Sequence, residues 1–353
     1  MEQRKTVIVV GAGASAEFGL PTGADLTKLI QVDLNIHTDG IGRLRLNSAN
    51  QVLCKAIEQR FEEFDHEARN ISVIAQQISK NMPLAPSIDN FLDTHRSNDE
   101  LVAIGKLAIA FAITRAEQKS ALRIDESNVN NRLDFTTEEA FGGHDSWANL
   151  LFKILVAKRD YEKFLEALEK VVFISFNYDR CIKQFFVNAA ASYFGLRDGQ
   201  ISEVLNSIQV VHPYGSLGEL SAASVRTSGY GREPMASEIL ESAKNIRTFT
   251  EGVDDLKTSS EIENSFNGSE LVIFLGFSFV DINMEILAAS DCNASRVLAT
   301  SYGRSKDTKS KLAHQLAQMY AAQKNIKQVE MFDGKCFELF YEFDKYLSEV
   351  LSA

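Results

Sequence analysis

Polar residues suited to chemistry follow four apolar segments of this 353-residue chain. The segments are followed by Gly11-Ala12-Gly13-Ala14-Ser15, Ser175-Phe176-Asn177-Tyr178-Asp179, His212-Pro213-Tyr214-Gly215 and Gly276-Phe277-Ser278. A glycine turn that leads into a helix can bring the backbone close to a phosphate. An amide such as that of Asn177 can hold a water or a sugar hydroxyl, and an imidazole can take a proton near neutral pH. Together these residue types suit the binding of a nucleotide and the activation of a water.

Each motif also has a purely structural interpretation. Asn177 and Asp179 are typical caps for a helix that begins near Arg180. His212 precedes a proline and can be a hydrogen-bonded core histidine. A lone Gly-Ala-Gly turn joins a strand to a helix in many α/β proteins. The occurrence of polar, glycine-containing turns after four separate strands is harder to explain by packing than any one of them.

The apolar segments have the length and the β-branched content of buried strands. We expect strands at 6–10, 171–175, 209–212 and 271–276, with shorter ones at 296–300 and 328–332, and helices between several of them. Strands that alternate with helices indicate a doubly wound, Rossmann-like α/β fold with a parallel sheet covered on both faces. In such a sheet, ligands bind outside the carboxyl ends of the strands, which is where the four motifs would meet.

A long helical insertion is expected after the first strand-turn-helix unit. Residues 24–32 form the first helix, and helical spacing then dominates up to about residue 167, with no convincing strand and with loops at 125–131 and 141–145. We therefore divide the chain into a sheet domain, residues 1–32 and 168–353, and a helical lobe, residues 33–167. A helix with one apolar face, from Cys336 to Val350, closes the chain against the sheet.

The composition limits the functional classes. A net charge of −11 and a pI near 5.2 argue against direct nucleic-acid binding, which normally needs a basic face. The four cysteines form no Cys-x-x-Cys pair, so we expect no metal site. No P-loop motif and no apolar run of membrane-spanning length is present, and no signal peptide opens the chain, so we expect a cytoplasmic protein.

The four motifs together resemble those of the Sir2 (sirtuin) superfamily. Gly11 to Ser15 matches the sirtuin Gly-Ala-Gly-x-Ser loop, and Asn177 and Asp179 match the Gln-Asn-x-Asp motif. His212 matches the His-Gly motif, and the stretch from Gly276 to Ser278 matches Gly-Thr-Ser. Phe176 replaces the sirtuin glutamine, and the four-cysteine zinc module is missing. The residues of these motifs are more similar to those of the bacterial Sir2-like proteins of antiphage defence than to those of sirtuins. A further segment, Ser87-Ile88-Asp89-Asn90-Phe91-Leu92, is also similar to one that is common in that group.

The resemblance implies roles for particular residues, with NAD as substrate and no metal. Asn177 would position the attacking water or the nicotinamide ribose. His212 would contact the ribose hydroxyls and act as the base, and Asp179 would help hold the nicotinamide end. The implied cofactor-binding residues are Gly11, Ala12, Gly13, Ser15, Thr22, Ser175, Gly215, Gly276 and Ser278. Arg180, Tyr214 and Tyr302 are further candidates for the pocket lining, and Asp89 and His95 lie in a polar segment that can reach over it.

The resemblance implies an NAD⁺ glycohydrolase that depletes cellular NAD⁺ as an antiphage effector. One alternative is a module that senses NAD or a related nucleotide and gates a partner without turnover. Another is an NAD-dependent protein deacylase, which the missing zinc module disfavours. Because a toxic hydrolase must be kept off, we expect control by assembly, either as a homo-oligomer or with a separately encoded partner. The resemblance implies that this partner is a HerA-type ATPase.

Overall fold

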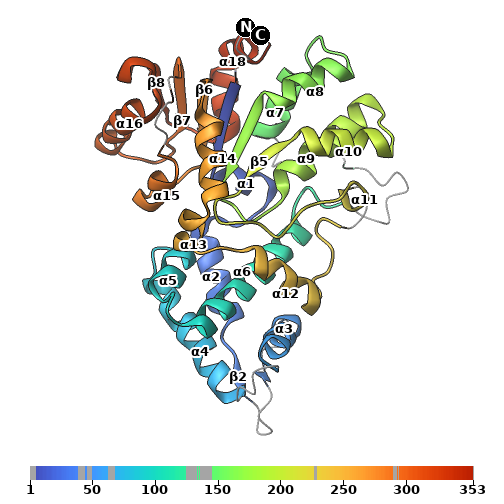
Figure 1. Cartoon of the computed structure of the whole chain (residues 1–353), viewed down its shortest axis with the longest axis vertical. Coiled ribbons are helices and arrows are strands. Elements are labelled where there is room, and N and C mark those ends of the chain that lie inside the picture. The colour runs from blue at the N-terminus through green and yellow to red at the C-terminus, as the bar shows by residue number, and fades with distance from the viewer. Residues whose placement is uncertain are drawn as a thin grey trace.

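The structure is a computed structural model, and it describes residues 5–38, 44–45, 50–62, 68–124, 133, 135, 145–225, 229–288, 292 and 294–352. The expected loop at 125–131 lies outside these residues, as does the one at 141–145 except for Asp145. Figure 1 shows a sheet with helices packed around it and a helical lobe that extends from its lower end.

A six-stranded, all-parallel sheet with the order β5-β4-β1-β6-β7-β8 forms the centre of the sheet domain. Its strands are β1 (Lys5–Val10), β4 (Val171–Ser175), β5 (Gln209–Val211), β6 (Ser269–Leu275), β7 (Arg296–Thr300) and β8 (Val329–Phe332). By order along the chain this is the 3-2-1-4-5-6 arrangement of the Rossmann fold, so the expected fold class is confirmed. The strand order reverses at β1, which places the Gly11 loop at the switch point.

Side chains of β1 alternate between two hydrophobic cores, one on each face of the sheet. Val7 and Val9 belong to a core that continues into the helical lobe, and Ile8 and Val10 belong to the core on the opposite face. Both faces are covered, which explains why the strands are continuous apolar runs without alternation. The first core also receives side chains from α14 and α16, and the second receives them from α7, α8, α9 and α17.

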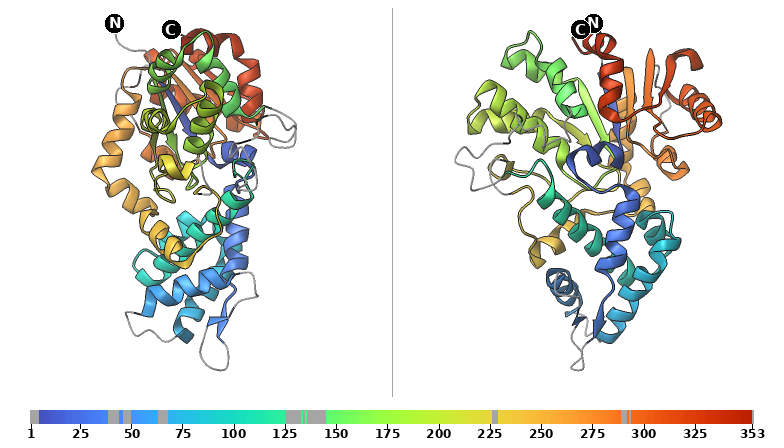
Figure 2. Two further views of the ribbon diagram at one scale, coloured as in Figure 1. Left: turned by 90° about the vertical axis from the view of Figure 1, so that its right-hand side faces the viewer. Right: turned by 180° about the vertical axis from the view of Figure 1, so that it is seen from behind.

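Helices on the sheet account for much of the chain (Figure 2). They are α1 (Ala12–Ser15), α7 (Trp147–Val156), α8 (Tyr161–Glu169), α9 (Cys181–Phe194), α10 (Asp198–Ser207), α11 (Ala222–Val225), α14 (Leu256–Phe266), α15 (Asp281–Ile286), α16 (Lys306–Tyr320), α17 (Cys336–Glu342) and α18 (Asp344–Ser352). Short 3₁₀ turns occur at Ala16–Phe18, Met82–Leu84, Ala322–Lys324 and Ile326–Gln328. The expected single C-terminal helix is wrong in one respect, because it breaks at Phe343 into α17 and α18.

The lobe consists of α2 (Gly23–Asp33), α3 (Gln51–Glu62), α4 (Ala68–Asn81), α5 (Ile88–Thr94), α6 (Asp99–Lys119), α12 (Ala236–Asn245) and α13 (Phe249–Asp254). Two short strands, β2 (His37–Thr38) and β3 (Leu44–Arg45), pair antiparallel in it, where the sequence indicated no strand. Helix α7 and most of α8 fall within the span 33–167 but pack on the sheet domain. Helix α12 comes from the second half of the chain but contacts α3 and α6 of the lobe. The domain boundaries inferred from sequence therefore stay a prediction.

Candidate functional site

The candidate residues lie on the carboxyl edge of the sheet, in the order of its strands. His212 follows β5, Asn177 follows β4, the Gly11–Ser15 loop follows β1, and Gly276 follows β6. The sheet therefore brings the four motifs to one edge, as the sequence predicts. The Gly11–Ser15 loop lies between the Asn177 side and the Gly276 side.

The glycines of the first loop are required by contact between two backbones. A Cβ atom on Gly11 would lie 2.5 Å from the Gly276 carbonyl oxygen, and one on Gly13 would lie 2.9 Å from the Gly276 Cα. The Gly13 amide donates to the Gly276 carbonyl at 3.1 Å, and the Gly11 amide donates to the Leu275 carbonyl at 2.9 Å. Both amides form hydrogen bonds within the protein, and the close approach of the two backbones explains why glycine is needed at both positions. The phosphate-binding role of the loop stays a prediction.

Asn177 ties the loop after β4 to the loop after β1. Its side-chain nitrogen donates to the Gly11 carbonyl at 3.0 Å and to Ser15 Oγ at 2.7 Å. The carbonyl only accepts, so the amide nitrogen must face it and the side-chain oxygen points elsewhere. Among the described residues, no hydrogen bond to that oxygen is formed. The Asn177 oxygen can therefore accept a hydrogen bond from a water or a ribose hydroxyl.

His212 is joined directly to Asn177. Its Nδ1 lies 3.0 Å from the Asn177 carbonyl oxygen, which accepts the Nδ1 proton and leaves the lone pair on Nε2. Burial lowers the pKa of His212, although the Asn177 carbonyl and the Asp179 charge act in the opposite direction. The imidazole is therefore neutral at neutral pH and can take a proton at Nε2. A recess of about 10 Å³ beside it, lined partly by Asp179 and Ser216, is comparable to the space that one water needs.

Asp179 caps the following helix, as the structural interpretation suggested. Its Oδ1 accepts the Cys181 amide proton at 3.1 Å, and its side chain is buried. Ser175 has a comparable local role, because its hydroxyl accepts the Asn177 amide proton at 3.3 Å. The Asn177 side chain, by contrast with that of Asp179, bonds to the β1 loop and not to the start of the helix.

A buried ion pair that sequence reasoning missed holds the start of α9. Glu117, at the end of α6, is fully buried and accepts protons from the Arg180 amide at 3.0 Å, from its Nε at 3.2 Å and from its terminal guanidinium nitrogen. The Arg180 guanidinium also lies over the Tyr230 ring, 5.9 Å from its centroid. Nothing in the sequence linked these two residues, which lie 63 positions apart.

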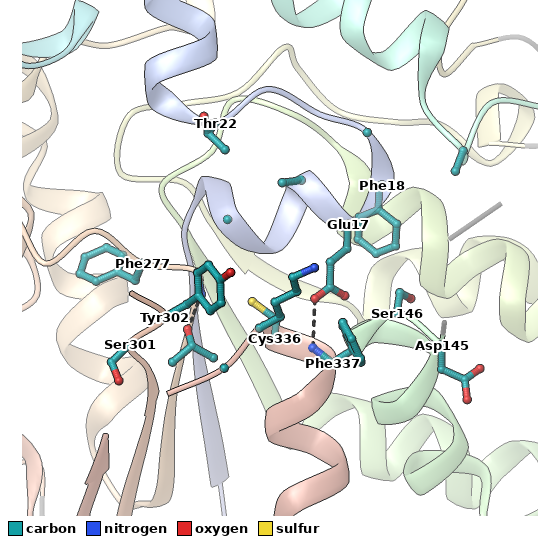
Figure 3. A pocket seen from close by; sticks show the side chains of 18 of the residues that line it. Glu17, Phe18, Thr22, Asp145, Ser146, Phe277, Ser301, Tyr302, Cys336 and Phe337 are labelled. Carbon is teal, nitrogen blue, oxygen red and sulfur yellow. Dashed lines mark hydrogen bonds between the residues drawn. The ribbon is translucent and has the colours of Figure 1, made fainter. Parts of the chain in front are cut away.

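A cavity of about 1070 Å³ opens on the other side of the β1 loop. Its walls come from the loops after β1, β6, β7 and β8 and from the start of α7 (Figure 3). Of the expected cofactor-binding residues, Gly13, Thr22 and Gly276 line it, and so does Tyr302. Asn177, Asp179 and His212 are not among its lining residues, and neither are Gly11, Ala12, Ser15, Ser175, Gly215 and Ser278.

Several expected residues have other local roles. The Thr22 side chain caps α2 by accepting the Asp25 amide proton at 3.3 Å. Gly215 has a φ of +73°, and a Cβ there would lie 1.7 Å from the Asn245 carbonyl oxygen, so this glycine is required by packing. Ser278 is exposed, and its carbonyl accepts a hydrogen bond from Arg304. Tyr214 is buried, and its hydroxyl donates to Asn283 Oδ1 at 2.6 Å.

Glu17 stands in the cavity wall, where it joins the starts of two helices. It accepts the Trp147 amide proton at 2.9 Å. It also accepts the Phe337 amide proton at 3.0 Å, the bond drawn in Figure 3. Burial raises the pKa of Glu17 to about 7, and these hydrogen bonds and nearby Lys335 limit the rise. Lys119, Arg304 and Lys335 also line the cavity, so cations are available for an anionic ligand.

Glu17 and Lys335 were not expected from the sequence. For Lys335 the available signal was position, because Gly334-Lys335 follows β8 on the same sheet edge. The candidates Asp89 and His95 do not line the cavity, and they lie on or beside helix α5. His95 Nδ1 contacts the Phe91 carbonyl oxygen at 2.8 Å, and its ring lies 4.3 Å from the Phe91 ring.

Comparison of the chain with protein-family models gave no match, and comparison with curated proteins gave none either. Within the described part of the chain, no helix is long and apolar enough to cross a membrane. The same residues contain no cluster of three or more His, Cys, Asp or Glu side chains that could hold a metal ion.

Proposed function

We propose that this chain is an NAD⁺ glycohydrolase that releases nicotinamide and ADP-ribose. The observation that carries the proposal is the hydrogen bond from His212 Nδ1 to the Asn177 carbonyl, because it joins a base to an amide whose side-chain oxygen is available. A base beside a water-orienting acceptor is the minimum that hydrolysis of a glycosidic bond to a good leaving group needs. We choose NAD as the substrate because the four motifs resemble those of the Sir2 superfamily.

A dinucleotide suits the distribution of polar groups along the edge. Neighbouring strands lie about 4.8 Å apart, so β4 and β7 are separated by roughly 14 Å. The ADP portion would occupy the cavity between β1 and β8, where Lys335 and Arg304 can balance its phosphates. The nicotinamide ribose would then reach across the Gly11–Ser15 loop toward Asn177. Dinucleotides bind across the switch point of Rossmann folds in this way.

The reaction follows from the residues on the β4 and β5 loops. A water that donates a hydrogen bond to the Asn177 side-chain oxygen would add to C1′ of the ribose while the bond from C1′ to the nicotinamide nitrogen breaks. Nicotinamide leaves with the electron pair of that bond, and the water proton passes to His212 Nε2. The negative charge of Asp179 would favour the cationic ribosyl group in the transition state. Most of the acceleration would come from holding the bond and the water in place.

In the cell, such an activity would deplete NAD⁺ after phage infection. We infer control by assembly, either as a homo-oligomer or with a HerA-type ATPase, because that is how the similar defence proteins are organised. Gel filtration tests this: a mass of one free chain together with full activity would contradict it.

A binding module that senses NAD or a related nucleotide is the second candidate. It is favoured by one observation, that Asn177, Asp179 and His212 lie outside the lining of the large cavity. A ligand confined to that cavity would not touch them.

The test measures nicotinamide release and NAD binding on the same preparations, with and without the product of a neighbouring gene. We expect wild-type protein to release nicotinamide, and Asn177→Ala and His212→Ala to lose about 10²-fold or more in kcat while still binding NAD. Binding without release under every condition would support the sensor. Full activity in both variants would refute the assigned roles.

A further inference from the structure

Helix α5 carries two aspartates, one turn apart, that reach toward the two candidate catalytic loops. Asp89 accepts a hydrogen bond from the Tyr178 hydroxyl on the β4 loop. Asp93 Oδ1 accepts the Thr250 amide proton at 3.0 Å and its hydroxyl proton at 2.6 Å, which holds the start of α13. Since residues four apart share one face of a helix, a single face of α5 makes both connections.

Tyr178 stands between Asn177 and Asp179, so its position affects both. Its side chain is buried in the hydrophobic core that the sheet shares with the lobe, which ties the middle of the β4 loop to the lobe. Its carbonyl accepts the Leu217 amide proton at 3.0 Å, which joins the β4 loop to the segment after His212. A shift of the Tyr178 ring would therefore move the backbone on either side of it.

Helix α13 continues the connection to the β5 loop. Its Gly252 lies so close to that loop that a Cβ atom would be 2.8 Å from the Pro213 carbonyl oxygen. Just before α13, the Arg247 amide donates to the Tyr214 carbonyl at 2.9 Å. Asp93 therefore holds a helix that lies directly on the residues following His212.

We propose that Asp89 is a positioning residue that acts through Tyr178 to place Asn177, so that hydrolysis requires the lobe to be docked on the sheet domain. The inference rests on the proposed NAD⁺ hydrolysis for its kinetic consequence only. Its structural part, the dependence of the β4 loop on α5, holds for any ligand. A protein partner that displaces α5 would then switch the site without touching substrate.

The test compares variants that keep or remove one hydrogen bond. Asp89→Asn retains an oxygen that can accept the Tyr178 proton, whereas Asp89→Leu and Tyr178→Phe remove the acceptor or the donor. Asn90→Ala, at an exposed position on the same helix, is the matched control. Hydrogen exchange is measured by mass spectrometry at the amides of Asn177, Cys181 and Leu217, which are hydrogen-bonded within these loops, and kcat and KM are measured for nicotinamide release.

We expect Asp89→Leu and Tyr178→Phe to speed exchange at these amides and to lower kcat by about 10- to 100-fold, with KM for NAD changed less than threefold. Asp89→Asn and Asn90→Ala should behave like the wild type. Unchanged exchange in Tyr178→Phe would overturn the inference, and equal losses in Asp89→Asn and Asp89→Leu would mean that the charge of Asp89 acts directly. Faster exchange without nicotinamide release by the wild type would refute the proposed function and leave the positioning role intact.

Discussion

Replacing Gly276 with alanine tests how much a close backbone contact adds to the loss of stability that a left-handed conformation alone would cause. Gly276 has a φ of +57°, and a Cβ there would lie 2.2 Å from the Ala14 nitrogen and 2.4 Å from the Gly13 carbonyl carbon. Gly268 has a φ of +71° with no atom within 4 Å of a Cβ, which makes Gly268→Ala a matched control.

The expected free energies follow from these two environments. An alanine in the left-handed region costs about 1–2 kcal/mol, a term that both variants share. At Gly276 the new methyl group also has to displace backbone, and overpacking of this kind costs about 1–3 kcal/mol more. We therefore expect a loss of roughly 1–2 kcal/mol in Gly268→Ala and of roughly 2–5 kcal/mol in Gly276→Ala.

Urea denaturation followed by tryptophan fluorescence measures the difference. Trp147 is the only tryptophan in the chain, and it is buried. Its indole nitrogen donates to the Ala14 carbonyl at 3.1 Å, so it reports on the loop that Gly276 contacts. Equal losses of stability in the two variants would refute the reasoning. They would show that the β1 loop can move away from the β6 loop at little cost.

Three further predictions concern charged and titratable groups. Glu117→Ala should lower the free energy of unfolding by about 3–5 kcal/mol in urea titrations, because it leaves the Arg180 charge buried without its partner. The double variant Glu117→Met/Arg180→Met should recover most of this loss. A double variant as unstable as the single one would contradict the prediction. Because burial lowers the pKa of His212, kcat/KM for NAD should be flat from pH 7 to 8 and should fall only below pH 6.5. A fall centred above pH 6.5 would argue against His212 as the base. Glu17, with a pKa of about 7, gains a negative charge in the cavity above that pH. The affinity for ADP-ribose, measured by calorimetry, should therefore fall by up to about tenfold per pH unit above 7. The affinity of Glu17→Gln should show no such pH dependence.

The fold could be predicted from the sequence because its strands are buried on both faces. Continuous apolar runs such as Val7 to Val10 and Val171 to Ile174 are typical of strands buried on both faces. The predicted ends of all six strands agree with the observed ones within two residues. The two-residue strands β2 and β3 were missed because so short a segment carries no periodicity. The break between α17 and α18 was missed because apolar spacing continues through Phe343.

The candidate site was only partly predictable. Asn177, His212 and Gly276 were found because each follows a strand directly, and a parallel sheet brings such positions together. Glu17 could not be recognised, because its importance comes from α7 and α17, whose starts meet at its carboxylate only in the folded chain. Asp89 was singled out by resemblance, but its partner Tyr178 is 89 positions away, and no local pattern connects the two.

The most direct test of the account is the rate of nicotinamide release from NAD⁺ by the wild-type protein and by Asn177→Ala, in the assembly in which the wild type is active. We predict release by the wild type and a loss of about 10²-fold or more in the variant, with NAD affinity retained. Release at the same rate by both proteins would contradict it, because the reaction would then not depend on the amide that joins the β4 loop to the β1 loop.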